Sequence, residues 1–203
     1  MADIRAFRGF RYDLARVGSL SAVVAPPYDV IDAALQQKLY DASEFNAIRV
    51  ELTKDGPDKY ADAAQTLRDW LSAEALRQDT ARGLYVYEQE FTVEGQTFVR
   101  RGFLARVRLV PFGEGVFPHE QTLSGPKADR LALYRATGFN LSPVFGLYPD
   151  DGGVFAKLEP LIRQSPPLEA TDHLGVINRL WVITDPQVVS SVIGAMGEKP
   201  VFI

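Results

Sequence analysis

The feature that most constrains the fold is a pair of β-rich segments joined by a two-residue turn. Residues 84–93 and 96–110 are rich in β-branched and aromatic side chains, and Glu94-Gly95 lies between them. A tight turn there pairs residue 93 with residue 96 and sets Glu88 opposite Arg101. A long antiparallel hairpin excludes an all-parallel sheet. We therefore expect an α+β fold, with a mixed sheet that contains this hairpin and is flanked by helices.

Helices and further strands alternate along the rest of the chain. Apolar residues at every third or fourth position predict a helix, and strict alternation predicts a strand. The patterns predict helices over residues 32–42, 58–76, 125–136, 153–163 and 186–197. They predict strands over residues 47–53, 143–148, 175–184 and 201–203, and irregular backbone over residues 1–31.

The domain organisation follows from this interleaving. We expect a single α+β domain over residues 1–203, with one candidate seam near residues 150–153. The last residues, Pro200 to Ile203, form an apolar run of the kind that begins a buried strand, whereas domains usually end in a polar tail. We therefore expect the chain to be the N-terminal portion of a longer one.

Composition excludes several classes of function. The net charge is −4 and no block of Lys and Arg occurs, so the chain is not expected to bind nucleic acid. There is no cysteine, which rules out disulfides, thiolate metal sites and a cysteine nucleophile. No apolar run approaches the roughly 20 residues of a membrane span. We expect a cytoplasmic protein without a membrane partner, and the sequence leaves the oligomeric state open.

The start of the predicted helix 125–136 has the features of an anion site. Ser124 can cap the helix, and Gly125-Pro126 suits its first turn. Free N–H groups and the helix dipole favour negative charge there, and Lys127 and Arg130 lie on one face. Together these groups can hold a phosphate or a carboxylate. The alternative is an ordinary capped helix with solvated cations.

Groups suited to acid–base chemistry lie in the neighbouring loops. His119 and Glu120 precede the helix closely, as does Thr122. Two prolines stiffen the segment before Tyr28 and Asp29, which can then form a pocket wall. The alternative for that segment is a rigid crossover with Tyr28 half buried.

The charged residues of the hairpin and the second histidine are better explained by structural roles. Glu88 and Glu90 face Arg100 and Arg101 on the hairpin. Paired carboxylates can perform acid–base work or bind a divalent metal, but cross-strand ion pairs explain these four residues more simply. The second histidine, His173, is far from the first in the sequence, so we predict a loop role for it and no metal site.

Several short motifs, taken in chain order, resemble one known family. The motifs are Ile4-Arg5-Ala6-Phe7-Arg8-Gly9, Ala25-Pro26-Pro27-Tyr28-Asp29-Val30-Ile31, Tyr85-Val86-Tyr87, Pro118-His119-Glu120, Leu123 to Leu131, and Asn140 to Tyr148. The family is the prokaryotic domain-of-unknown-function family numbered one thousand and fifteen, and the similarity covers essentially the whole chain. The chain departs from the family pattern at Gln121, where a basic residue is frequent, and at Asn178, where a histidine is common.

The resemblance implies a longer protein that handles small metabolites. Family members continue past a strand matching residues 201–203 into an Asp-Gly-His-His-Arg loop. That loop is similar to the phosphate-binding loop of ParB/sulfiredoxin-like nucleotide-binding proteins, some of which are small-molecule kinases. The family is often encoded beside serine-biosynthesis functions.

Together, the motifs predict a protein that binds a phosphorylated small molecule or a nucleotide. In this hypothesis Ser124, Gly125, Lys127, Arg130 and Tyr28 bind the ligand, and a small-metabolite phosphotransferase would use Mg²⁺ with ATP or ADP. His119, Glu120 and Asp29 are the candidate catalytic residues. The alternatives are a non-catalytic ligand-binding sensor and a structural or interaction module without pocket chemistry.

Overall fold

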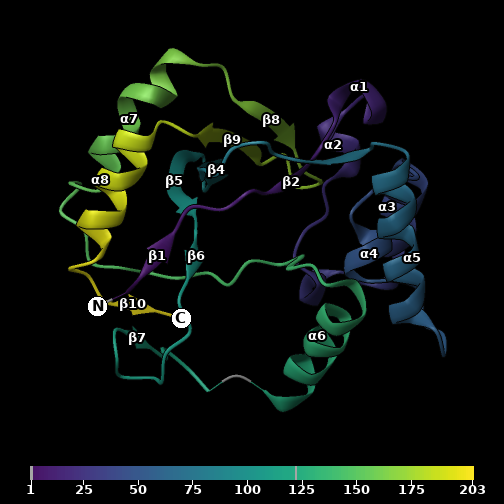
Figure 1. Cartoon of the computed structure of the whole chain (residues 1–203). Helices are drawn as coiled ribbons and strands as arrows, with labels where there is room; N and C mark the ends of the chain where they lie inside the picture. Colours follow the sequence, from purple (N-terminus) through teal and green to yellow (C-terminus); the bar gives the residue numbers. More distant parts are fainter. Residues whose placement is uncertain (1, 122) are drawn as a thin grey trace.

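A four-stranded antiparallel sheet lies at the centre of the chain (Figure 1). The structure is a computed structural model and describes residues 2–121 and 123–203. The strand order is β5-β4-β9-β8. The strands are β4 (Leu84–Val93), β5 (Gln96–Leu104), β8 (Leu168–Thr171) and β9 (Ile177–Ile183). The α+β class is confirmed, but the central sheet is wholly antiparallel where a mixed sheet was expected.

The hairpin forms in the predicted register. Val93 pairs with Gln96, and Glu88 lies opposite Arg101. Glu94 and Gly95 both have positive φ, 50° and 79°, as a two-residue turn matched to the twist of the strands requires. The turn chemistry therefore fixes which residues face each other along the whole hairpin.

Helices α7 (Phe155–Gln164) and α8 (Pro186–Met196) cover one face of the sheet (Figure 1). α8 starts as predicted, because Asp185 accepts hydrogen bonds from the first turn and Pro186 occupies the first helical position. α7 runs through Pro160 without interruption. Apolar residues from both layers form the larger core: Leu84, Val86, Val154, Leu158, Trp181, Ile183, Val192 and Met196.

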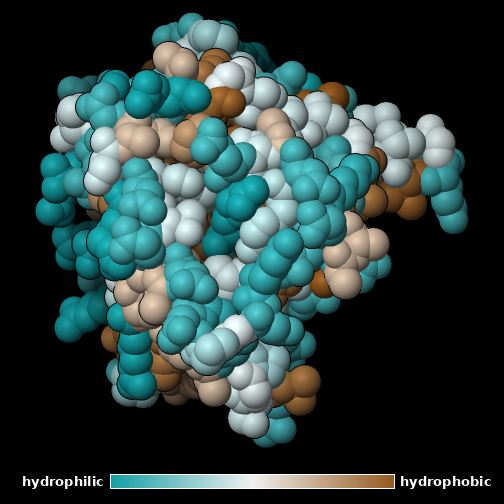
Figure 2. Space-filling model, turned by 90° about the vertical axis from the view of Figure 1, so that its right-hand side faces the viewer, coloured by the Kyte–Doolittle hydropathy of each residue, from teal (hydrophilic) through white to brown (hydrophobic). Residues whose placement is uncertain are grey.

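A second group of helices lies on the other side of the molecule, and two of them contribute to an apolar cluster separate from the larger core. These helices are α3 (Ala33–Ala42), α4 (Ile48–Glu51), α5 (Lys59–Ser72) and α6 (Ser124–Thr137). Val50, Leu67, Trp70 and Ala75 form the centre of this cluster. The outer face of the group, seen in Figure 2, is mostly hydrophilic, which is typical of amphipathic helices that bury one stripe.

The remaining helices and strands are short. They are β1 (Ile4–Arg5), β2 (Phe10–Tyr12), α1 (Leu14–Val17), α2 (Leu20–Val23), the 3₁₀ helix η1 (Tyr28–Val30), β3 (Leu76–Gln78), β6 (Arg106–Val107), β7 (Val116–Phe117) and β10 (Val201–Phe202). β7 and β10 form a parallel pair beside which Leu147 makes a single bridge to Phe202. Within residues 2–121 and 123–203, no helix is both long and apolar enough to cross a membrane.

The strand predicted over residues 47–53 is wrong, because this segment contains α4. The side chain of Asn46 accepts a hydrogen bond from the Ile48 N–H and donates to the carbonyls of Ala22 and Val24. This buried amide starts a helical turn and overrides the alternating pattern.

Other boundaries also differ from the predictions. Residues 143–148 form no strand apart from the bridge at Leu147. α5 ends at Ser72, and the residues after it continue into β3. Residues 1–31 contain five short elements where irregular backbone was expected. β3 pairs with β2 and Leu147 bridges to Phe202, so contacts distant in sequence decide part of this local structure.

Candidate functional site

The start of α6 is exposed, and its capping residue makes no side-chain hydrogen bond to the first turn. The capping position is Leu123, so the prediction that Ser124 caps the helix is wrong; Ser124 is the first helical residue. Ser124, Gly125 and Lys127 are all exposed. Pro126 has no N–H, so the backbone donors left at this end are those of residues 123–125. The surface therefore offers backbone donors and one cation to an anion.

Arg130, one turn further along α6, already has carboxylate partners. Its Nη1 donates to Glu51 Oε1 at 3.0 Å and to the Glu51 carbonyl at 2.9 Å. Its Nη2 donates to Asp129 Oδ2 at 2.5 Å. The Glu51 side chain is only 9% exposed and also accepts a hydrogen bond from the Ser142 hydroxyl. Arg130 thus joins α6 to α4 and to the loop at Ser142.

Asp129 extends this network to α5. Its Oδ1 accepts hydrogen bonds from the Tyr60 hydroxyl at 2.7 Å and from Lys59 Nζ at 3.2 Å. Partial burial by itself would raise the pKa of Asp129, but the hydrogen bonds from Tyr60, Arg130 and Lys59 outweigh it and lower that pKa to about 2. Asp129 is therefore a carboxylate at neutral pH, and the local charges of the network nearly cancel. The ion pairs around α6 leave Lys127 out.

Tyr28 lies against this network. The Arg130 guanidinium carbon lies 4.0 Å from the centre of the Tyr28 ring, a cation–π contact. Tyr28 is half buried, and Asp29 beside it is exposed. The structure therefore brings Tyr28 and Arg130 together, and sequence reasoning identified both.

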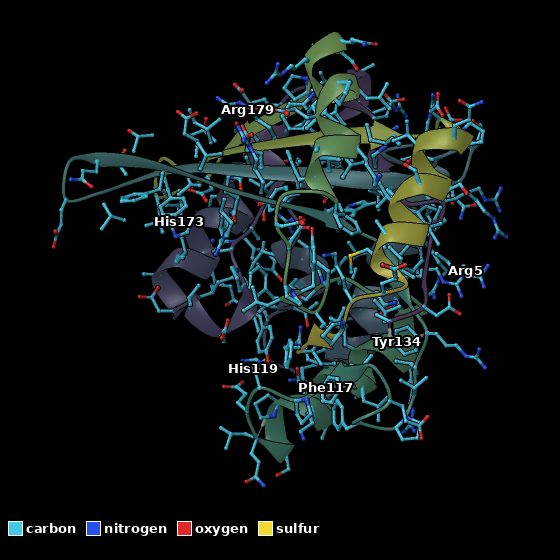
Figure 3. The ribbon with its side chains drawn as sticks, turned by 90° about the vertical axis from the view of Figure 1, so that its left-hand side faces the viewer. Arg5, Phe117, His119, Tyr134, His173 and Arg179 are labelled. Carbon is cyan, nitrogen blue, oxygen red and sulfur yellow. The ribbon has the colours of Figure 1, made fainter. Side chains whose placement is uncertain are left out.

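His119 and Glu120 follow β7, at the edge of the parallel pair with β10. The His119 N–H donates to the Ile203 carbonyl at 2.8 Å, and its Nε2 lies 3.9 Å from Glu120 Oε2. Both side chains are more than half exposed. Figure 3 shows His119 beside Phe117 and well apart from His173, so the histidines do not converge on one site. Thr122, named with His119 in the sequence hypothesis, lies outside the described residues.

The hairpin carboxylates form ion pairs, but only one of them is a predicted cross-strand pair. Arg101 Nε donates to Glu88 at 2.8 Å, whereas Arg100 donates to the Gln89 side chain. Sequence reasoning missed the central cation, Arg179 of β9, which contacts Glu88, Glu90 and Glu169 within 3.1 Å. Hydrogen bonds from Glu90, Glu169 and Glu88 raise the pKa of Arg179, even though desolvation lowers it. No pattern within β9 alone identifies the carboxylates that surround this residue.

Two surface grooves lie near the ends of the central sheet. A wide groove of about 540 Å³ lies between β4 and the turn before β9, and Gln89, Arg100 and Leu174 are among its lining residues. A smaller groove of about 170 Å³ is lined in part by Pro26, Lys38 and His173. Neither groove includes a predicted site residue.

The arrangement can hold an anion but has no preformed metal centre. Within residues 2–121 and 123–203, no three His, Cys, Asp or Glu side chains gather closely enough to bind an ion. What the site offers is a helix start with an exposed lysine, set on a rigid ionic network that includes Arg130 and Tyr28.

Comparison with known proteins gives one match. The family model described as "Protein of unknown function (DUF1015)" matches residues 4–203. No curated protein and no solved structure matches the chain. The similarity to ParB/sulfiredoxin-like proteins therefore stays a prediction. Because the match covers nearly every residue, the chain belongs to the DUF1015 family of proteins of unknown function.

Proposed function

We propose that this protein binds a phosphorylated small molecule, such as a nucleotide, at the surface where α6 begins. The observation that carries the proposal is the start of a 14-residue helix whose capping residue, Leu123, has no polar side chain and whose first turn has no acidic residue. Such an end presents N–H donors and the positive end of the helix dipole to an anion. Lys127, exposed in this turn, adds a full positive charge.

In this proposal Arg130 positions the site and does not contact the phosphate. Its charge is shared between Glu51 and Asp129, so displacing either carboxylate for a ligand would leave a partly buried charge unpaired. Its stacking on Tyr28 fixes η1 beside α6, which keeps Asp29 near the entrance to the site. The network thus supplies rigidity, and Lys127 with the backbone supplies the binding.

Phosphoryl transfer is the reaction that we propose for such a ligand, in the cytoplasm where nucleotides are available. His119 and Glu120 are the proposed acid–base pair, because they are exposed and lie close to each other just before the helix. Mg²⁺ would enter with the phosphates of ATP or ADP and reduce the charge of the transferred group. A non-catalytic sensor would bind the same ligand without turnover.

Titration calorimetry with ATP, ADP and phosphoserine, each with and without Mg²⁺, tests the proposal. We expect saturable binding of at least one ligand, and Lys127→Ala to weaken it about five- to tenfold, as loss of an exposed charge contact worth about 1 kcal/mol implies. Lys38→Ala, another exposed lysine, is the control and should bind like the wild type. A phosphotransfer assay with His119→Ala then separates an enzyme from a sensor.

One observation favours a structural module as the second candidate. Arg130 contacts Glu51 of α4, and Glu51 contacts Ser142, so this pair holds α4, α6 and the loop at Ser142 together, which is what a motif retained only for folding would do. If none of the three ligands binds and Lys127→Ala changes at most the melting temperature, the structural explanation replaces the binding proposal.

A further inference from the structure

The outer edge of the central sheet has no partner strand within residues 2–121 and 123–203. β5 is the end strand, and β4 is its only neighbour in the sheet. Residues 96–101 are all exposed. Figure 3 shows the hairpin projecting well beyond the body of the protein, and Figure 2 shows the projection from the opposite side. Unpaired N–H and C=O groups on such an edge are a template for another strand.

The projecting half of the hairpin is also unusually apolar for an exposed edge. Val93, Phe98 and Val99 are 50%, 45% and 46% exposed. Natural edge strands are commonly protected by charged side chains, by proline or by a bulge. β5 contains no proline, and its pairing with β4 runs without a bulge from Gln96 to Leu104.

The two arginines of β5 do not protect its unpaired edge from another strand, because the side chains of both fold back over the sheet. Arg101 pairs with Glu88 on one face. Arg100 donates to the Gln89 side chain on the other face, and its guanidinium lies 5.9 Å from the centre of the Phe91 ring. Both guanidinium groups also lie over rings elsewhere in the same chain, Arg100 over Phe145 and Arg101 over Phe155, so their charges are engaged away from the edge.

The turn geometry fixes which residues of β5 direct their backbone groups outward. In a two-residue hairpin the residues that flank the turn exchange both backbone hydrogen bonds. Gln96 is therefore bonded to β4, as is every even-numbered residue after it. The odd-numbered residues, Thr97, Val99 and Arg101, direct their N–H and C=O groups away from the sheet.

We propose that two copies of this chain associate through β5, antiparallel and in a register centred on Val99. This register sets Thr97 opposite Arg101 of the second copy, and Phe98 opposite Arg100 of the second copy. A register centred on Arg100 or Arg101 would set identical charges against each other. One centred on Phe98 pairs fewer residues, because β5 begins at Gln96.

The strand that we expect to pair with this edge is β5 of a second copy, because the edge is complementary to itself in this register. The two four-stranded sheets would then join into one continuous sheet across a two-fold axis, the commonest symmetry of soluble dimers. Each copy would cover the exposed valines and phenylalanine of the other. This inference does not depend on the anion site, which lies on α6.

Single-cysteine variants test the register, because the chain has no cysteine of its own. Opposed residues in an antiparallel pair have Cα atoms about 5.5 Å apart, within the range that a disulfide spans. Under mild oxidation Val99→Cys should form a covalent dimer and Thr97→Cys alone should not. A mixture of Thr97→Cys and Arg101→Cys chains should form the mixed dimer.

Light scattering after gel filtration tests the association itself. The wild type should run as a dimer, and Val99→Lys should dimerise at least tenfold more weakly, because two lysines then oppose each other at the axis. Val93→Lys, an equally exposed change on β4, should remain a dimer, and circular dichroism confirms that both variants are folded. A wild type that is monomeric at every concentration, or equal cross-linking at residues 97 and 99, overturns the proposal.

Discussion

Arg130→Met is the substitution that probes the ionic network beneath the candidate site most severely. The methionine keeps an unbranched apolar stem but removes the guanidinium, and with it the hydrogen bonds to Glu51 and Asp129. Asp129 keeps Tyr60 and Lys59 as partners, whereas the buried Glu51 carboxylate keeps only the Ser142 hydroxyl. We therefore expect the cost to come chiefly from Glu51.

The size of this effect follows from the contacts that are lost. Removing one partner of a buried ion pair typically costs about 3–5 kcal/mol, and Arg130, at 24% exposed, belongs near the lower end of that range. Loss of the Tyr28 contact is included in this figure and contributes about 0.5–1 kcal/mol. For a chain of this length, a loss of about 3 kcal/mol corresponds to a melting temperature lower by roughly 6–12 °C.

Urea unfolding followed by circular dichroism measures this cost, and a second substitution identifies its source. Adding Glu51→Gln to Arg130→Met removes the unpaired charge and should restore about 1–2 kcal/mol. Arg135→Met, at an exposed position later on α6, should change stability by less than about 0.5 kcal/mol. A cost below about 1 kcal/mol for Arg130→Met, or no recovery on adding Glu51→Gln, would refute the reasoning.

Three further predictions concern packing and pH. Gly83→Ala should destabilise by about 1–3 kcal/mol in urea unfolding, because the new Cβ would lie 2.8 Å from the Ile183 carbonyl; Gly56→Ala, with open space around it, should not. The lowered pKa of Asp129 contributes stability that is present above the usual carboxyl pKa and lost as pH falls from about 5 towards 2. At 29% exposed, that contribution is about 1–2 kcal/mol after solvent screening. Asp129→Asn should flatten this part of the stability–pH curve. Arg179→Met leaves Glu88, Glu90 and Glu169 without the cation that they share, so it should lower the free energy of unfolding measured in urea.

Local chemistry made much of the fold predictable. The positive-φ pair at residues 94–95 set the hairpin register, and Asp32 and Asp185 started their helices where caps were expected. The failures occurred where a partner distant in sequence decides the structure. α4 forms because Asn46 bonds back to Ala22 and Val24, which the alternation around Ile48 cannot reveal.

The candidate site was likewise predictable only in part. The residues at the start of α6, and Tyr28 beside Arg130, were identified from sequence because caps, glycines and prolines mark such loops. The role of Arg130 was not predictable, because its partner Glu51 lies in a segment that was expected to be a strand. Lys59 and Tyr60 were likewise missed, because nothing in their own helix indicates that they contact Asp129.

The most direct test of the central claim is an NMR titration of the protein with ATP and Mg²⁺, observing the backbone amides of the first turn of α6. The account predicts saturable shifts of the Ser124 and Gly125 amide signals with a single dissociation constant, and smaller shifts in Lys127→Ala at the same ATP concentration. The account would be contradicted if the amide signals of residues 124 and 125 did not move while signals elsewhere shifted on ATP binding.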